Sequence, residues 1–239
     1  MIMLVSDVHC QYDLIDKQVF HAEDKQGKKV AQVIVLGDLG YFEHELNDFF
    51  KHNPKGFCRP VAFIDGNHED FAALFDRPDQ FSPALTYLPR ATLHQFENFS
   101  MLALGGAAYM GAAVTPLGSE ITAEQIENCL QFSHDDVDIV ISHDCPQGIG
   151  LRNQPGFEHY GPPGFQRGLE IAEHLRPRLW FFGHHHRWFD RQCGSTRFVG
   201  ITEIWKGYAL LMDDGEVVIE KNELSRRLSW WQHFWFGKG

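Results

Sequence analysis

The chain has 239 residues, of which 21 are basic and 32 acidic, so its formal net charge is −11 with histidine neutral. An acidic surface repels phosphate backbones, and the sequence carries no strong signature of nucleic-acid binding. Hydrophobic residues make up 44 % and charged residues 22 %, which excludes a disordered, collagen-like or coiled-coil chain. The 14 histidines are unusual, and because histidine is the commonest metal ligand, their placement matters.

The first residues, Met1 to Asp7, contain neither a basic region nor a long apolar run, so we expect no signal peptide. No run of about 18 apolar residues predicts a transmembrane helix. The five cysteines include no Cys-x-x-Cys pair, so neither a structural zinc site nor a thioredoxin-like motif is indicated. We therefore expect reduced thiols in a cytoplasmic protein.

Short apolar runs alternate with helical patterns along most of the chain, which favours an α/β fold with a largely parallel sheet. The predicted strands are Ile2–Val5, Val33–Leu36, Val61–Ile64, Met101–Leu104, Val137–Ile141 and Leu179–Phe182. The predicted helices are Tyr12–Glu23, His44–Lys51, Asp70–Asp76, Ala123–His134 and Gln166–Leu175. Three later runs, Phe198–Ile201, Tyr208–Met212 and Val217–Ile219, are typical of an antiparallel meander.

Two irregular segments interrupt this alternation. Gly105–Gly118 is rich in Gly and Ala, and Arg152–Pro163 is rich in Gly and Pro. Long loops of this kind tend to be functional or mobile. The first of them is a candidate to line a ligand cleft.

Polar side chains follow five of the predicted strands at the point where each strand ends. These side chains are Asp7 with His9, Asp38, Asn67 with His68, His143, and His184 with His186. Ligands of open α/β sheets bind beyond the carboxyl ends of the strands, so all five groups are expected to face one crevice. If the chain stays extended, the i, i+2 spacing of Asp7 and His9 points both side chains the same way.

Each group alone is more often an ordinary turn or a surface pair, but five groups at five strand ends favour a site. Carboxylate, imidazole and amide oxygen are ligands of first-row divalent metals. The sequence therefore predicts a metal site at this edge.

The order Asp-x-His, Gly-Asp, Gly-Asn-His-Glu, His and Gly-His-x-His resembles the signature of the calcineurin-like metallophosphoesterases, from Ile2 to about Ile219. The resemblance implies a four-layer αββα sandwich with two divalent metal ions at the loop ends. It implies that the first ion is held by Asp7, His9, Asp38 and His186. The second would be held by Asp38, Asn67, His143 and His184, with the Asp38 carboxylate bridging. His68 would not bind metal and would stand beside the leaving-group oxygen.

The implied activity is hydrolysis of a phosphomonoester or phosphodiester by in-line attack of a metal-bridging hydroxide. The substrate would be a phosphate-ester small molecule or a nucleotide. The nitrogen and oxygen ligands suit Mn, Fe or Zn and do not choose among them. The alternative is a catalytically silent scaffold or binding module of the same fold. Arg152, Arg167 and Arg187 lie near the metal motifs and are as readily surface residues as phosphate contacts.

The sequence differs from the motifs of some metallophosphoesterase subfamilies, and these differences count against membership in them. Protein Ser/Thr phosphatases carry Gly-Asp-x-x-Asp-Arg, whereas this chain has Tyr41 and Phe42 at the last two positions. The segments Ser142–Pro146 and His174–Phe181 are weakly similar to lariat-debranching phosphodiesterases. Those enzymes have Cys where this chain has Asp7. The substrate therefore stays open between these classes.

The domain prediction divides the chain into a metallophosphoesterase domain, residues 1–223, and an aromatic, basic and amphipathic tail, residues 224–239. A helical stripe is predicted from the spacing of Leu224, Leu228, Trp231 and Trp235. We expect this tail to dock on the domain or on another subunit in a homo-oligomer. A peripheral membrane contact is the second interpretation, because Trp beside basic residues suits a headgroup layer.

Overall fold

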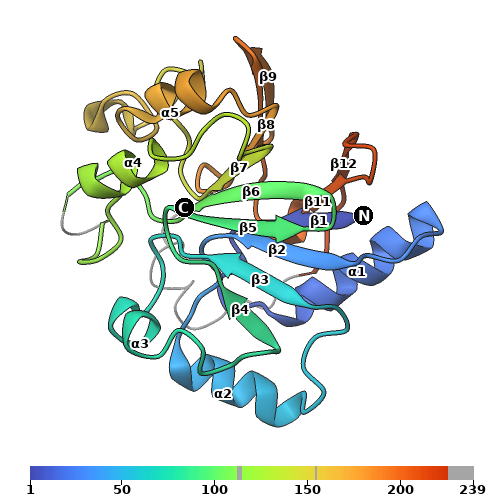
Figure 1. Ribbon diagram of the computed structural model, residues 1–239. Helices are drawn as coiled ribbons and strands as arrows, with labels where there is room; N and C mark the ends of the chain where they lie inside the picture. Colours follow the sequence, from blue (N-terminus) through green and yellow to red (C-terminus); the bar gives the residue numbers. More distant parts are fainter. Residues whose placement is uncertain (112–114, 154, 226–239) are drawn as a thin grey trace.

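Two mixed β-sheets lie face to face in the computed structural model, which describes residues 1–111, 115–153 and 155–225 (Figure 1). The first sheet has the order β12-β11-β1-β2-β3-β4. Its strands in chain order are Ile2–Val5 (β1), Gln32–Leu36 (β2), Val61–Ile64 (β3), Leu85–Tyr87 (β4), Gly207–Leu211 (β11) and Val217–Lys221 (β12). The second sheet has the order β5-β6-β7-β8-β10-β9. Its strands are Thr92–Phe96 (β5), Phe99–Leu104 (β6), Ile139–Ser142 (β7), Leu179–Phe182 (β8), Phe189–Cys193 (β9) and Thr196–Gly200 (β10).

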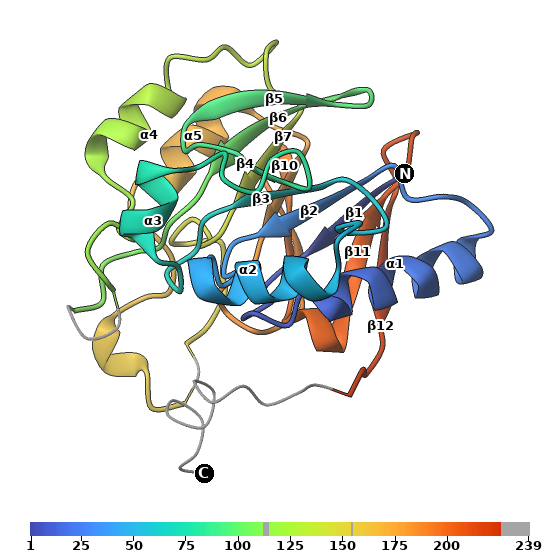
Figure 2. The same ribbon diagram turned by 90° about the horizontal axis from the view of Figure 1, so that it is seen from below.

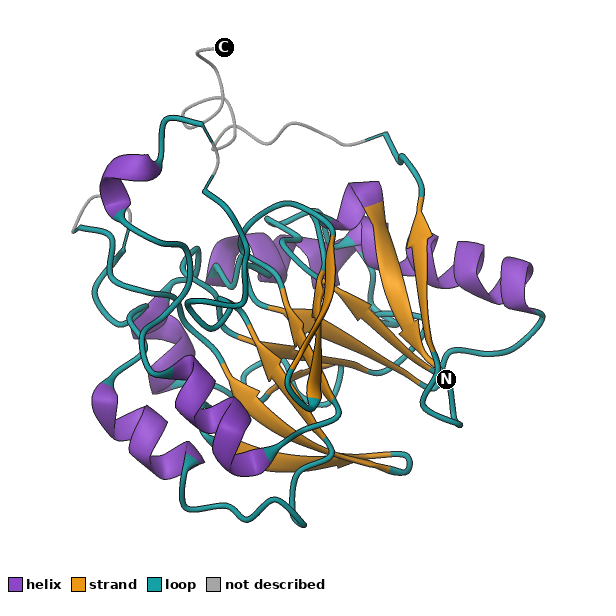
Figure 3. Ribbon diagram, turned by 90° about the horizontal axis from the view of Figure 1, so that it is seen from above, coloured by secondary structure: helices purple, strands orange, loops and turns teal. Residues whose placement is uncertain are grey.

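Helices cover the outer faces of the two sheets, as Figures 2 and 3 show from opposite sides. Those packed on the first sheet are Asp13–Gln26 (α1), Glu43–His52 (α2) and Phe71–Asp76 (α3). Those packed on the second are Ala123–Cys129 (α4) and Gly168–Leu175 (α5). Two short 3₁₀ helices, Glu158–Tyr160 (η1) and Ile204–Lys206 (η2), lie in loops. The layers are helix, sheet, sheet and helix, which confirms the four-layer αββα sandwich.

The apolar strands are buried on both faces, and this is why they lack polar alternation. In β1, Ile2 and Leu4 belong to the core between the sheets, whereas Met3 packs toward α1. In β6, Met101 faces the inter-sheet core and Leu102 packs toward α4 and α5. Successive side chains of a strand point to opposite faces. Each central strand therefore supplies two of the three core layers.

The parallel strands of both sheets end at one edge of the sandwich. Strands β1, β2 and β3 are parallel, and so are β6, β7 and β8. The loops after β1 and β2 are joined by a hydrogen bond from Asp7 N to Gly37 O at 3.2 Å. The loops after β7 and β8 are joined by one from Gly183 N to His143 O at 2.9 Å. All five motif loops meet at this edge.

Three details of the expected secondary structure are corrected. The meander is wrong, because β10 lies in the second sheet parallel to β8, and only β11 and β12 form the antiparallel pair. Strands β4, β5 and β9 were not expected, since they are short or mostly polar edge segments. The helix predicted over Ala123–His134 ends at Cys129. Beyond it, the Ser133 backbone and hydroxyl bond to the Asp136 carboxylate, which competes with helix formation.

The predicted helical stripe of the tail lies largely outside the described residues, which end at residue 225. Leu224 packs against the first-sheet core, and its backbone N–H donates to Trp205 O at 2.8 Å. Docking, oligomerisation and membrane contact by the rest of the tail stay predictions. Among the residues that the structure describes, no helix combines the length and apolarity needed to cross a bilayer.

Candidate metal centre

The motif loops hold their functional residues in the left-handed backbone region. Asp7, His9, Asp38, His184 and His186 have φ angles between 49° and 65°. The extended i, i+2 geometry expected for Asp7 and His9 is therefore wrong, although both side chains do reach the same site. A non-glycine residue in this conformation costs about 1–2 kcal/mol. Such strain concentrates at functional sites, and here it concentrates in the loops that carry the predicted ligands.

Two motif glycines allow neighbouring loops to approach closely. A Cβ atom on Gly66 would lie 2.1 Å from Asp38 Oδ1, and one on Gly37 would lie 2.3 Å from His143 Nδ1. Both distances are far below van der Waals contact, so any side chain here would push a predicted ligand away. These glycines are required by packing against Asp38 and His143.

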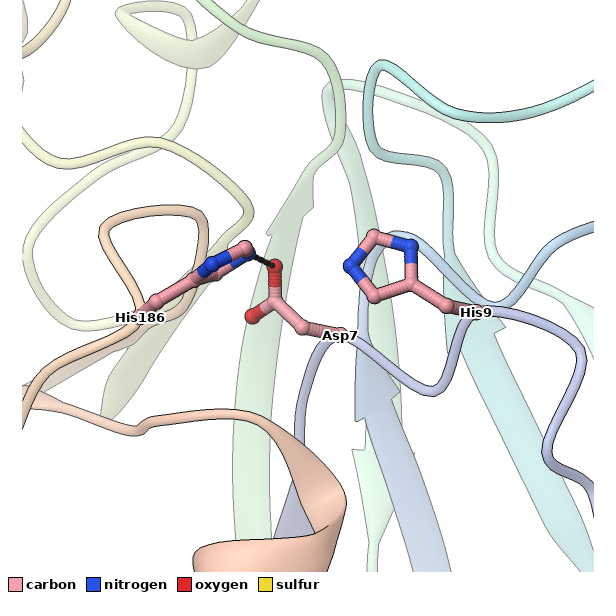
Figure 4. A group of neighbouring side chains, drawn as sticks. All are labelled: Asp7, His9 and His186. Atoms are coloured by element: carbon pink, nitrogen blue, oxygen red, sulfur yellow. Dashed lines mark hydrogen bonds and ion pairs between the residues drawn. The ribbon is translucent and has the colours of Figure 1, made fainter. Parts of the chain in front are cut away.

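A first group of potential ligands surrounds the Asp7 carboxylate (Figure 4). Figure 4 shows this carboxylate between the imidazoles of His9 and His186, and one potential ligand atom from each residue lies within 4.8 Å of the others. His186 Nε2 is 3.1 Å from Asp7 Oδ1, and His184 N donates to Asp7 Oδ2 at 3.1 Å. The Glu203 carboxylate lies 3.8 Å from the other ring nitrogen of His186.

A second group combines Asp7 with Asp38 and His143, again within 4.8 Å. His143 is fully buried, and its Nε2 lies 3.3 Å from Asp38 Oδ1 and 3.2 Å from Asn67 Oδ1. Asp38 Oδ1 also accepts the backbone N–H groups of Asn67 at 2.8 Å and His68 at 2.9 Å. The other Asp38 oxygen lies 3.9 Å from His9 Nε2. Asp38 therefore stands between His9 and His143, although Asp7 is the residue that the two groups share.

The two remaining predicted residues lie beside these groups. The His184 ring is 4.9 Å from the His143 ring, though His184 belongs to neither group. The exposed His68 has its ring 5.4 Å from that of His9, at an edge-on angle of 76°. The structure thus brings all eight predicted residues to one place. The assignment of ligands to each ion stays a prediction.

Two histidines carry the neutral ring that a metal ligand needs. Desolvation lowers the pKa of His9 to about 4 and that of His184 to about 3, against the partial effect of nearby carboxylates. In the described part of the chain, the buried His9 Nε2 atom has no hydrogen-bond partner. A buried polar atom left unpaired costs about 1–3 kcal/mol. A cation beside this nitrogen would remove that cost, so the site fits a divalent metal.

The other two histidines are paired with carboxylates. Burial alone would lower the pKa of His143, but Asp38 raises it to about 10. Asp7 likewise raises the pKa of His186 above its usual value, and both carboxyl groups have lowered pKa values despite burial. Buried carboxylates need positive charge beside them. Without metal, a proton on His143 supplies such charge beside Asp38, and a metal ion would displace it.

The comparisons with known proteins agree with this geometry. Residues 1–188 match the family described as calcineurin-like phosphoesterase. The chain belongs to this family. Family membership supports phosphoester hydrolysis in general and the use of divalent metal ions, for which the structure has candidate ligand groups.

Three proteins that resemble this chain share little sequence identity with it. The lariat debranching enzyme of Entamoeba histolytica is 24 % identical over 255 residues, covering 85 % of this chain and 68 % of the relative. The phosphopantetheinyl hydrolase of Mycobacterium tuberculosis has a TM-score of 0.53 at 11 % identity, covering 85 % of this chain and 89 % of its own. GAP50, the anchor in the inner membrane complex of Plasmodium, has a TM-score of 0.55 at 9 % identity, covering 95 % and 89 %. These structural likenesses show the fold alone.

Tyr41, which replaces the Asp of the protein-phosphatase motif, packs in the protein core. Tyr41 is buried, stacks on Phe63 with ring centroids 5.7 Å apart, and donates from its hydroxyl to Arg77 O at 3.0 Å. It therefore lies in the core rather than beside His68. Phe42 lines the cleft in front of the site, where protein phosphatases of the family have Arg.

The glutamate of the Gly-Asn-His-Glu motif holds two motif loops together, a role that we did not predict. Glu69 is buried and accepts backbone N–H groups from Leu39 at 3.0 Å, from Gly66 at 3.3 Å and from Tyr41. Burial raises its pKa to about 8, with a contribution from Asp38. Glu69 thereby fixes the Asp38 loop against the Asn67 loop. The only indication in the sequence of a special role for Glu69 was its position in the Gly-Asn-His-Glu motif.

A second unpredicted residue, Asp144, joins three loops of the second sheet. Its buried carboxylate accepts from Ala108 N at 2.9 Å, from Cys145 N at 2.7 Å and from His185 Nε2 at 2.8 Å. Burial opposes ionisation, but His184 and His185 lower the pKa of Asp144 below its usual range. Cys145 Sγ is 3.3 Å from His185 Nε2. The hydrogen bond to this carboxylate fixes the position of the His185 ring, a residue for which the sequence suggested no role.

A cleft of about 850 Å³ opens in front of the candidate metal centre. Its lining includes the candidate ligands His9, Asn67, His184 and His186 and residues of both long irregular loops. The three candidate phosphate-binding arginines also line it. Arg167 is paired with Glu127 and Glu170, each at 2.8 Å. Arg187 Nη1 donates to Arg152 O at 3.0 Å.

Proposed function

We propose that the chain is a metal-dependent phosphoesterase that hydrolyses a phosphomonoester or a phosphodiester at this cleft. The observation that carries the proposal is the pair of ligand groups that share Asp7 beside the cleft. The buried His9 Nε2 atom next to them accepts or donates no hydrogen bond within the described residues. Two bound divalent ions would clamp the attacking and leaving oxygens and lower the pKa of water. The chain would supply the ligands, the orientation and a proton.

The proposed first set of ligands is Asp7, His9, Asp38 and His186, and the second is Asp38, Asn67, His143 and His184. Support for a bridging Asp38 comes from its two oxygens, one 3.3 Å from His143 and the other 3.9 Å from His9. The amide oxygen of Asn67 adds a ligand without adding negative charge. The sets suit Mn, Fe or Zn.

His68 is proposed as the catalytic acid. Its backbone N–H donates to Asp38 Oδ1, which fixes the loop, while its exposed side chain lines the cleft. A histidine in this place can protonate the leaving-group oxygen of the ester. Its ring belongs to neither of the two ligand groups described above.

The test is turnover after chelation and reloading. The full-length protein would be stripped with a chelator and reloaded with Mn²⁺, Fe²⁺ or Zn²⁺, then assayed with p-nitrophenyl phosphate and bis-p-nitrophenyl phosphate. We expect no turnover by the stripped protein and recovery with at least one metal. The ratio of the two rates separates phosphatase from phosphodiesterase. Metal binding without turnover of either ester would favour the silent scaffold, and turnover by the stripped protein would refute metal dependence.

A further inference from the structure

Exposed aromatic side chains gather in the cleft that leads to the candidate metal centre. Tyr109 is 60 % exposed, Phe157 is 47 % exposed and Tyr160 is 40 % exposed, and all three line this cleft. Other exposed large apolar residues of the described chain, such as Phe20 on α1, lie outside it. Apolar side chains exposed together in a concave site indicate ligand binding, whereas scattered ones need no explanation.

The aromatic residues come from two separate loops. Tyr109 follows β6 in the first irregular loop. In the second loop, Phe157 directly precedes η1 and Tyr160 is its last residue. The rings of Phe157 and Tyr160 are 5.9 Å apart at 37°, and the His159 ring is 4.0 Å from that of Tyr160. Such rings offer flat faces on which a planar group can stack. We call Tyr109, Phe157 and Tyr160 the aromatic wall.

Two arginines of the cleft suit a phosphate-bearing ligand. Arg152 and Arg187 line the same cleft as the aromatic wall. Arg187 donates to a backbone carbonyl, and within the described residues neither guanidinium lies in an ion pair, unlike that of Arg167. Guanidinium groups bind phosphate oxygens in a bidentate manner. The cleft therefore combines the candidate metal centre, two arginine side chains and the exposed faces of aromatic rings.

We propose that the aromatic wall stacks on a nucleobase, so that the ester cleaved at the metal end is a nucleotide. This inference rests on the proposed function and names the substrate class of the same site. Base stacking on aromatic side chains is tolerant of base identity, because every base has a π-face. The net charge of −11 disfavours a long polyanionic strand. A single nucleotide or a short ester of one therefore fits better than a nucleic-acid chain.

Hydrolysis of two matched diesters tests the aromatic wall. Thymidine 5′-p-nitrophenyl phosphate and methyl p-nitrophenyl phosphate have the same leaving group and differ in the arm that carries the base. We expect kcat/KM to favour the thymidine ester by about tenfold, and the preference to fall about tenfold in Tyr109→Ala or Phe157→Ala. Tyr109→Phe should keep the preference, and so should Phe20→Ala, a matched exposed aromatic outside the cleft.

Binding provides a readout that does not need turnover. Thymidine 5′-monophosphate and 2-deoxyribose 5-phosphate differ only in the base, and calorimetry would compare their affinities for the metal-loaded wild type and the same variants. Stronger binding of thymidine 5′-monophosphate that Tyr109→Ala weakens supports the inference, even if no ester is hydrolysed. Absence of turnover of both diesters and of p-nitrophenyl phosphate would contradict the proposed function alone. Equal affinities and equal kcat/KM values for both members of each pair would overturn the inference while leaving phosphoester hydrolysis intact.

Discussion

Two regions of the cleft are built in opposite ways: the motif loops that carry the candidate ligands, here called the floor, and the two irregular loops that carry the aromatic wall, here called the wall. The floor consists of short loops at strand ends, with left-handed residues, close glycine contacts and largely buried polar side chains. The wall consists of the two long irregular loops, which carry the exposed rings of Tyr109, Phe157 and Tyr160 and the side chain of Arg152. Binding groups on loops adapt readily when a rigid scaffold positions the chemistry. Under the proposed function, bond cleavage would take place at the floor and the wall would select the substrate.

The largest effect is expected from Asp38→Asn in the floor. The carboxylate contacts His143, lies near His9 and accepts two backbone N–H groups. Its replacement should lower hydrolysis of p-nitrophenyl esters to the background rate and reduce the metal content measured by mass spectrometry. Asp24→Asn, an exposed change on α1, is the control. Normal metal content and turnover in Asp38→Asn would remove this residue from the floor.

The next effect is expected from His68→Ala. Because His68 is assigned to proton transfer and not to metal binding, kcat should fall by about 10²–10⁴-fold while the metal content stays that of the wild type. The loss should be smaller for esters with acidic leaving groups such as p-nitrophenol than for alkyl esters. Wild-type kcat on an alkyl ester would show that the role is misassigned.

A smaller effect is expected where floor and wall are joined. Asp144 connects the wall at Ala108 with the floor beside His184 through His185. Asp144→Asn replaces one acceptor oxygen by an amide donor, which cannot accept from a backbone N–H. We expect metal affinity or kcat to fall by about 10- to 100-fold, as for other residues that orient ligands. Wild-type values for both, measured by titration and steady-state kinetics, would show that the two regions are independent.

The smallest effect concerns pH. In the metal-free protein, Asp38 raises the pKa of His143 to about 10, so this ring carries a proton near neutral pH. Metal must displace that proton, and apparent affinity should therefore rise with pH, by about tenfold per unit for each proton released. Calorimetry of Mn²⁺ binding in buffers of different ionisation enthalpy would count the protons. Affinity independent of pH between 6 and 8, a span of about two units, would contradict the displacement.

The sequence predicted where the candidate ligands lie better than how they are held. Asp7 and His9 were placed correctly because an apolar run precedes them. Their left-handed conformation has no local signal, since neighbouring loops and glycines such as Gly66 impose it. Glu69 stood in the Gly-Asn-His-Glu motif, but two of its three partners, Leu39 and Tyr41, lie 30 and 28 positions away, and only folding brings them together.

Sheet membership was equally hidden from local pattern. Phe198–Ile201 was correctly predicted as a strand, but propensity does not say which sheet a strand joins. The edge strands β5 and β9 alternate too weakly to be recognised. The four-layer arrangement itself came from the resemblance and not from periodicity.

The seven candidate ligands are divided between the two sheets. The loops after β1, β2 and β3 supply Asp7, His9, Asp38 and Asn67, whereas those after β7 and β8 supply His143, His184 and His186. A chain emerging from the ribosome therefore presents its first four ligands long before the last three. If all seven bind metal, complete coordination would require that residue 186 has been made and that the second sheet has docked on the first. Metal binding would then occur late in the synthesis and folding of the protein, after the two sheets have packed together.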